Sequence, residues 1–127
     1  MPLEDAIDAF CTAVNEGDQD AVRRVSEPHA YHDSLSPEHL VKHAVRSGLS
    51  LVFATRYTMS DTHAAVEAAW HREGRPTGRT WLMFCQRDGD WRFTGRTDSE
   101  LVGQAYVHLE QDEAPSIDRW PASDAVN

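Results

Sequence analysis

The sequence has few of the features that mark secreted, membrane-spanning or disulfide-bonded proteins. Its 127 residues include only two cysteines, Cys11 and Cys85, and neither belongs to a CxxC pair or to a Cys/His ligand spacing. The longest apolar stretches, such as residues 49–54, are far shorter than the roughly 20 residues that a membrane-spanning helix needs. Residues 1–10 lack the basic stretch of a signal peptide. We therefore expect a cytoplasmic protein in which both cysteines are buried as small apolar side chains.

Positive charge is also scarce. Twelve Lys and Arg, of which only Lys42 is a lysine, face twenty-one Asp and Glu, and the formal net charge is -9. Such a surface repels phosphate backbones and anionic lipids, so we expect neither nucleic acid nor a membrane as a partner. The sequence also lacks a GxSxG elbow, a phosphate-binding P-loop and a GxGxxG turn, and we expect no cofactor.

Hydrophobic periodicity predicts three helices in the first part of the chain. Residues 3–25 carry apolar side chains at helical spacing, with an interruption at residues 15–18 that predicts a corner between two helices. Gly17 can end the first helix, and Asp18 can cap the second. Ser36 followed by proline predicts the start of a third helix, which Gly48 ends.

The remainder of the chain alternates between apolar and polar residues as strands do. The strands that we expect cover residues 51–59, 64–72, 79–87 and 91 to about 101, after a short strand at residues 30–33, with turns at residues 73–76 and 88–90. Helices followed by such a meander predict an α+β domain with an antiparallel sheet, which we assign to residues 1–109. Residues 110–127 are acidic and contain two prolines, and we expect a mobile tail with Trp120 as its one candidate anchor.

Two segments of the sequence resemble a known superfamily. AIDAFCTAVNEGDQDAVRRV is similar to the helical opening of nuclear-transport-factor-2-like proteins, and RTWLMFCQRDGDWRF is similar to their closing hairpin. The resemblance covers residues 3–101. It implies three N-terminal helices packed in a strongly curved, mixed or antiparallel sheet, which form a cone, or α+β barrel, with an internal apolar pocket. The superfamily includes ketosteroid isomerases, polyketide cyclases, dehydratases, epoxide hydrolases and members without catalysis, so it predicts the fold better than the reaction.

The resemblance places a candidate general base at Asp33, where a loose alignment puts the catalytic Asp of ketosteroid isomerase. A carboxylate in an apolar cavity loses hydration, and its pKa rises toward the working range. Capping the turn at residues 34–36 is the alternative role, and His32 could act in place of Asp33. The two oxyanion donors of the isomerase fall on Phe10 and near Trp81, which cannot replace them.

A second candidate is a charged pair on the last predicted strand. Arg96 and Asp98 are two residues apart and share a side, where they could orient a substrate carbonyl or activate a water. Together with Asp33 they resemble, in residue type, the Asp-Arg-Asp set of the superfamily's epoxide hydrolases. A salt bridge at the rim is the alternative. His39 and His43 have the i, i+4 spacing of two metal ligands, but without a third ligand we expect surface residues and no metal.

Alternation along the strands assigns provisional faces to their residues. We expect one side of each of two strands to line the pocket, namely Val66, Ala68 and Trp70, and Trp81, Met83 and Cys85. The resemblance puts Arg92, Thr94, Arg96 and Asp98 inward on the last strand. It leaves Trp91, Phe93 and Thr97 outward. We expect Phe84 and Trp91 on the outer face, where the superfamily commonly pairs sheets into a homodimer. The expected substrate-binding residues are Phe10, Tyr31, Phe53, Tyr57, Trp70, Trp81, Met83 and Thr94.

Two functions remain open from the sequence. The first is a cofactor-independent acid–base enzyme of the isomerase, cyclase, dehydratase or epoxide-hydrolase type, which acts on a small hydrophobic metabolite in bacterial polyketide or natural-product biosynthesis. Its catalytic residues would be Asp33 or His32 with Arg96 and Asp98. The second is a non-catalytic module of the same fold, which binds a small ligand or assembles as a dimer.

Overall fold

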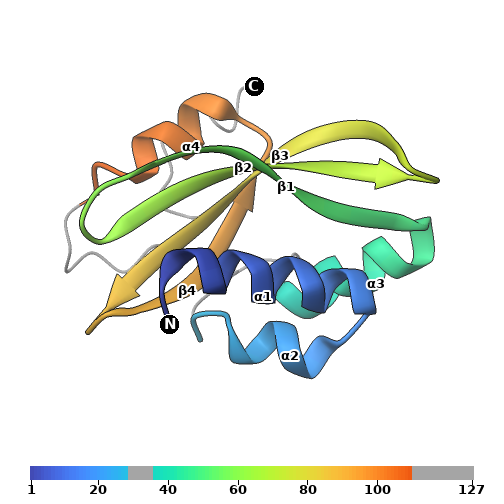
Figure 1. The fold of residues 1–127 in the computed structure, drawn as a ribbon, viewed down its shortest axis with the longest axis horizontal. Helices are drawn as coiled ribbons and strands as arrows, with labels where there is room; N and C mark the ends of the chain where they lie inside the picture. Colours follow the sequence, from blue (N-terminus) through green and yellow to red (C-terminus); the bar gives the residue numbers. More distant parts are fainter. Residues whose placement is uncertain (29–35, 110–127) are drawn as a thin grey trace.

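The chain folds into one curved sheet with helices on both of its faces. A computed structural model describes residues 1–28 and 36–109. Figure 1 shows α1, α2 and α3 along one face of the sheet and α4 on the opposite face. The elements are α1 (Leu3–Glu16), α2 (Gln19–Arg24), α3 (Pro37–Ser47), β1 (Leu49–Met59), β2 (His63–Arg72), β3 (Arg75–Arg87), β4 (Asp90–Thr97) and α4 (Glu100–Tyr106). None of the helices in these ranges is long and apolar enough to cross a membrane.

The corner between α1 and α2 forms where the sequence predicts it. Gly17 ends α1 in the left-handed conformation, with φ of 69°, which glycine adopts without steric cost. The Asp18 carboxylate accepts a hydrogen bond of 3.0 Å from the backbone N–H of Ala21 and caps α2. A Cβ at position 17 would lie 3.1 Å from Cγ2 of Val45, so Gly17 also lets α1 approach α3.

Local signals also fix both ends of α3. The hydroxyl of Ser36 accepts a hydrogen bond of 3.3 Å from the backbone N–H of His39, and Pro37 occupies the first turn. Gly48 ends the helix in the left-handed conformation. The face that packs on the core consists of Pro37, Leu40, Val41 and Ala44.

Two tight turns and three irregularities shape the sheet. The strands follow one another in the order β1-β2-β3-β4, and all neighbours are antiparallel. The turn after β2 has positive φ at Glu73 and Gly74, and the turn after β3 has positive φ at Asp88 and Gly89, as two-residue hairpins require. Each strand pair contains one shift of register, and such shifts bend and twist strands. The result is the curved sheet of Figure 1 and the predicted α+β cone.

Three phenylalanines fill the inner face, which is the face toward α1, α2 and α3. The rings of Phe10 and Phe93 stack with their centroids 3.9 Å apart, and Phe84 meets Phe10 edge-on at 6.2 Å. All three are fully buried, and Trp91 belongs to the same cluster. The prediction that Phe84, Trp91 and Phe93 face outward is therefore wrong, because directly paired residues of antiparallel strands share a face.

The outer face is covered by α4, a helix that lies where the sequence predicts the end of a strand. β4 ends at Thr97 rather than near Leu101. Ser99 then caps α4, since its hydroxyl accepts a hydrogen bond of 3.2 Å from the N–H of Val102. Val102 and Tyr106 are both buried and lie at i, i+4, which is the helical signal that the strand prediction misses.

Trp81 and Met83 lie under α4, and the prediction that they line the inner pocket is wrong. Val66 faces the inner core and pairs with Leu82, so Leu82 faces inward and its two neighbours face outward. Trp81 packs with Val107, and Met83 is fully buried in a cluster with Cys85 and Tyr106. The predicted alternation is off by one residue on β3, and such a shift assigns every side chain of the strand to the wrong face.

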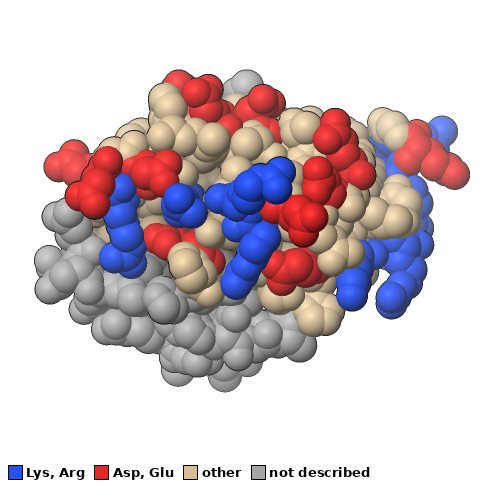
Figure 2. All heavy atoms as spheres, turned by 90° about the horizontal axis from the view of Figure 1, so that it is seen from below, with Lys and Arg blue, Asp and Glu red and all other residues tan. Residues whose placement is uncertain are grey.

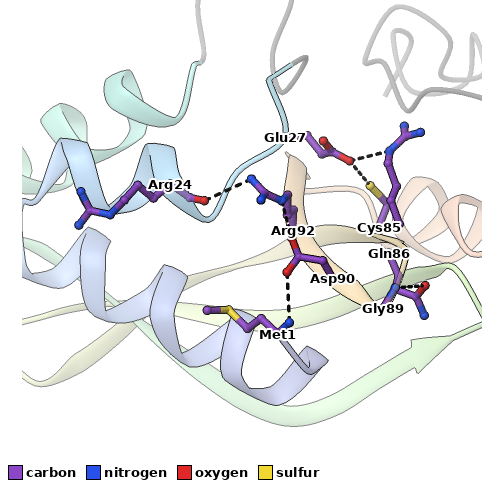
Figure 3. A network of polar contacts seen from close by, with 9 residues as sticks. Met1, Arg24, Glu27, Cys85, Gln86, Gly89, Asp90 and Arg92 are labelled. Atoms are coloured by element: carbon purple, nitrogen blue, oxygen red, sulfur yellow. Dashed lines mark hydrogen bonds and ion pairs between the residues drawn. The ribbon is translucent and has the colours of Figure 1, made fainter.

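A polar network joins the start of the chain to β3 and β4 (Figure 3). The backbone N–H of Glu27 donates a hydrogen bond of 2.7 Å to the carbonyl of Phe93, so the chain after α2 runs beside β4. The Glu27 carboxylate accepts hydrogen bonds from Nε of Arg87 at 2.8 Å and from the thiol of Cys85 at 3.1 Å. Nearby, Asp90 accepts from Arg92 at 2.8 Å and from the terminal ammonium of Met1 at 3.1 Å.

Both cysteines are buried, as the sequence predicts. Burial, with a contribution from Asp8, raises the pKa of the Cys11 thiol to about 12. Burial raises the pKa of Cys85 to about 12 as well, and its hydrogen bond to Glu27 adds to the effect. Both thiols should therefore stay protonated near neutral pH, and a protonated thiol is a weak nucleophile.

Candidate functional site

A pocket of about 610 Å³ opens between α3 and the sheet. It lies at the end of the molecule where β1 begins and the β2–β3 hairpin turns, on the right in Figure 1. All four strands reach it, since Leu49, Trp70, Gly78 and Arg96 contribute to its walls. Its volume is within the range of about 300–1,000 Å³ that is typical of small-molecule sites.

One wall of the pocket is apolar. Leu40 projects from the buried face of α3, and Leu49 and Trp70 come from the first two strands. Leu49 and Trp70 are partly buried and pack against the inner core cluster. Because the core holds these side chains, the wall offers a fixed apolar surface and an indole ring to a ligand.

The opposite wall contains the charged pair that the sequence predicts. Nη1 of Arg96 donates hydrogen bonds to Oδ1 of Asp98 at 2.6 Å and to the hydroxyl of Thr80 at 3.0 Å. The Arg96 side chain is 19% exposed, whereas Asp98 is 70% exposed. Two bonds from one nitrogen hold the guanidinium in place at the sheet, and Asp98 lies on the solvent side.

The exposed side of α3 brings nitrogen-bearing side chains to the same pocket. His39, His43 and Arg46 occupy positions i, i+4 and i+7, which form one face of a helix, and Lys42 lies beside them. Nδ1 of His39 lies 2.8 Å from the hydroxyl of Ser36, which leaves Nε2 for other partners. The sequence shows the spacing of the two histidines, but their position at a pocket depends on how α3 packs. In residues 1–28 and 36–109, no three His, Cys, Asp or Glu side chains are grouped as metal ligands.

Three of the predicted site residues lie together in this pocket, namely Trp70, Arg96 and Asp98. Asp33, His32, Tyr31 and Trp120 lie outside the residues that the structure describes. Leu40, Leu49 and the side chains of α3 belong to the pocket although the sequence does not single them out as ligand contacts.

The other predicted binding residues lie elsewhere. Phe10 is enclosed by the phenylalanine cluster, and α4 covers Trp81 and Met83. Thr94 is buried beside the hydroxyl of Tyr106 on the outer face, so the inward position predicted for it is wrong. The register shift of β4 lies next to Thr94 and breaks the alternation on which that prediction depends.

Phe53 belongs to a different and smaller hollow. It is 38% exposed and contributes, with Cys11 and Asn15, to a groove of about 340 Å³ between α1 and β1. Tyr57 packs against the inner core, and the two rings lie 6.4 Å apart. A register shift separates these residues on β1, and Phe53 is not among the described lining of the pocket beside α3.

Comparisons with known proteins identify the fold. No family model and no curated protein matches the chain. Among solved structures, a nuclear-transport-factor-2-like protein of unknown function from Silicibacter pomeroyi is 15% identical, with a TM-score of 0.55 over 74% of this chain and 88% of that chain. A putative calcium/calmodulin-dependent protein kinase type II association domain from Thiobacillus denitrificans is 14% identical, with a TM-score of 0.55 over 76% and 92%.

A third similar structure is a hypothetical protein with a ketosteroid isomerase-like fold from Catenulispora acidiphila, in complex with trimethylamine. It is 16% identical, with a TM-score of 0.52 over 91% of this chain and 100% of that chain. Identities this low establish architecture and leave the reaction open. The chain therefore has the cone fold of the nuclear-transport-factor-2-like superfamily, as its sequence resemblance implies.

Proposed function

We propose that this protein binds a small organic molecule in the pocket between α3 and the sheet. The observation that carries the proposal is the common lining: an indole from Trp70 and an ordered charged pair, Arg96 and Asp98, line one open pocket with apolar walls. Apolar walls with a few fixed polar groups are what small-molecule sites generally have. The complex of a similar fold with trimethylamine also supports a small ligand.

We further propose that acid–base chemistry takes place on this ligand without a cofactor. Asp33, or His32 in its place, is the proposed base, and Arg96 with Asp98 polarises the substrate, in a reaction of the isomerase, cyclase, dehydratase or epoxide-hydrolase type. Asp33 precedes Ser36 by three residues in the sequence, and Ser36 caps the helix that carries one wall of the pocket. Bacterial natural-product biosynthesis is the setting that this chemistry suggests.

Ligand binding is tested with a library of small organic molecules and two matched tryptophan variants. Thr77→Trp introduces an indole at the pocket, whereas Thr58→Trp places the same group at an exposed position of β1, away from the pocket. Binding to the folded state raises Tm, so ligands should raise the Tm of the wild type and of Thr58→Trp. They should not raise the Tm of Thr77→Trp. Equal shifts in all three proteins would place binding elsewhere and contradict the proposal.

A non-catalytic binding module is the second candidate. Its support is that Phe10, where the resemblance puts one oxyanion donor of the isomerase, is enclosed by aromatic rings, and that Asp98 is exposed. With a ligand identified, Asp33→Asn separates the two candidates. An enzyme should lose at least about 100-fold in turnover and keep its ligand affinity within a few fold. If the protein is a binding module, the wild type should also leave the ligand chemically unchanged.

A homodimer through the sheet stays a prediction. Its expected contacts, Phe84 and Trp91, are buried in the inner core, and α4 covers part of the outer face. Light scattering of the purified chain at 10–100 μM, a range of about tenfold in concentration, would measure the oligomeric state directly.

A further inference from the structure

The pocket gathers positive charge in a chain that is strongly negative. The formal net charge is -9, yet Lys42, Arg46 and Arg96 all line the pocket, and Asp98 is the one carboxylate in its described lining. Figure 2 shows Lys and Arg side chains gathered at the right-hand end of the helix face, the end at which Figure 1 places α3 and the β2–β3 turn. Such a concentration of one charge raises the local potential and attracts ions of the other sign.

The helix α3 separates its charges in a way that leaves the pocket positive. Its carboxylate, Glu38, lies 3.4 Å from Nε of Arg23 and so contacts α2. Lys42 and Arg46 are like charges at i, i+4, a spacing that slightly destabilises a helix. Within residues 1–28 and 36–109, the side chain of neither residue forms an ion pair or a hydrogen bond. Their charge is therefore available to a ligand.

Across the pocket from α3, the guanidinium of Arg96 has hydrogen-bond donors without partners among the described residues. Both of its hydrogen bonds use Nη1, and in the described part of the chain its Nη2 and Nε have no partner. A guanidinium that is mostly removed from water costs free energy when its donors are unused. Its planar fork fits the two oxygens of a carboxylate or phosphate.

Arg79 shows the contrast with a cation that is already satisfied. It also borders the pocket, but its Nη1 lies 3.0 Å from Oε2 of Glu67. Glu67 in turn lies 3.6 Å from Nε of Arg56, whose guanidinium stacks over the Trp81 ring beside α4. The charge of Arg79 is thus used on the outer face of the sheet, unlike that of Arg46.

We propose that the ligand of the pocket is an organic anion, with an apolar body and one carboxylate or phosphate group. The body packs on Trp70 and Leu49, and the anionic group lies between Arg96 and the nitrogen-bearing face of α3. This inference rests on the proposed function, because it specifies the ligand class of the same pocket. It accounts for an apolar wall and an unneutralised positive wall in one site.

The test uses three ligands with the same ring: 1-naphthaleneacetate, its neutral amide and 1-naphthyl phosphate, titrated by calorimetry at pH 7.5. We expect the carboxylate or the phosphate to bind at least about tenfold tighter than the amide, since charge-assisted hydrogen bonds are the stronger ones. The difference between the two anions identifies the preferred group. Raising the salt concentration should weaken the binding of the two anions and leave the affinity for the amide unchanged.

Two arginine variants provide the matched control. Arg46→Gln and Arg24→Gln each remove an exposed arginine from the last turn of a helix, but only Arg46 lines the pocket. Arg46→Gln should lower the affinity for the anion about fivefold to tenfold and leave the affinity for the amide unchanged. Arg24→Gln should change neither affinity. If amide and anion bind equally well, the inference fails and the proposed function stands. If no member of the panel binds at millimolar concentration, both fail.

Discussion

The side chain of Asn15 hydrogen-bonds the edge of β1 that faces away from β2, and its removal gives a sharp test of the fold. Within residues 1–28 and 36–109, β1 pairs only with β2, and its other edge meets α1. There the backbone N–H of Leu51 donates to Oδ1 of Asn15 at 2.6 Å, and Nδ2 of Asn15 donates to the carbonyl of Leu51 at 2.9 Å. One amide thus replaces a neighbouring strand at this position and ties α1 to β1.

Asn15→Ala removes both hydrogen bonds and leaves the two backbone groups of Leu51, a residue that is 1% exposed, without these partners. Each bond contributes about 1 kcal/mol, and the higher helix propensity of alanine returns about 0.5 kcal/mol. We expect a loss of about 1–2 kcal/mol in the free energy of unfolding and a fall of about 1 M in the urea midpoint. Tryptophan fluorescence in urea measures both.

Two further variants separate the hydrogen bonds from helix propensity. Thr12→Ala changes an exposed residue of the same helix and should leave the midpoint nearly unchanged. Asn15→Asp keeps an acceptor for the N–H of Leu51 but turns an ionised oxygen toward its carbonyl, which should raise the pKa of the new carboxyl. A carboxyl whose pKa is higher in the folded state than in the unfolded state destabilises the fold as pH rises. The loss in free energy of unfolding caused by Asn15→Asp should therefore be larger at pH 7 than at pH 4. A cost of Asn15→Ala below about 0.5 kcal/mol would refute the reasoning.

Two other predictions concern packing under α4 and the buried thiols. A Cβ on Gly103 would lie 3.1 Å from the Trp81 ring, so Gly103→Val should cost about 1–3 kcal/mol. Gly78→Val, where a Cβ meets nothing within 4 Å, is the control, and equal costs by thermal melting would contradict the packing argument. Because burial raises the pKa of Cys11 and Cys85 from 9.0 to about 12, stability should be full below pH 9 and fall between pH 9 and 12. Measured by urea unfolding, the stability of Cys11→Ala should fall less steeply between pH 9 and 12 than that of the wild type. An equally steep fall in both proteins would show that the Cys11 thiol does not cause the loss.

The ends of the helices could be predicted because their causes are local. Gly17, Asp18, Ser36 and Gly48 each act on backbone groups within a few residues, and all four have the predicted role. The faces of β3 depend instead on which residues of β2 it meets. Alternation gives two solutions that differ by one residue, and only pairing such as Val66 with Leu82 decides between them.

The candidate site was only partly accessible to sequence reasoning for the same reason. Alternation groups Trp70 with Val66 and Ala68 on one face, and the resemblance puts Arg96 inward. The i, i+2 spacing of Arg96 and Asp98 predicts their contact. The contribution of α3 could not be assigned, because His39, His43 and Arg46 look like solvent-exposed residues of an amphipathic helix. Only the packing of α3 over the ends of the strands makes them part of a pocket.

The division of the pocket between α3 and the sheet has a consequence for specificity. Phe10, Phe84 and Phe93 pack against one another inside the cone, and the pocket described above lies beside α3 at the end where β1 begins. The core needs only the buried face of α3, and its outer face can change without loss of the fold. The charge of the ligand should therefore depend mainly on α3. The position of any reacting group should depend on Arg96 and Asp98, which the sheet holds.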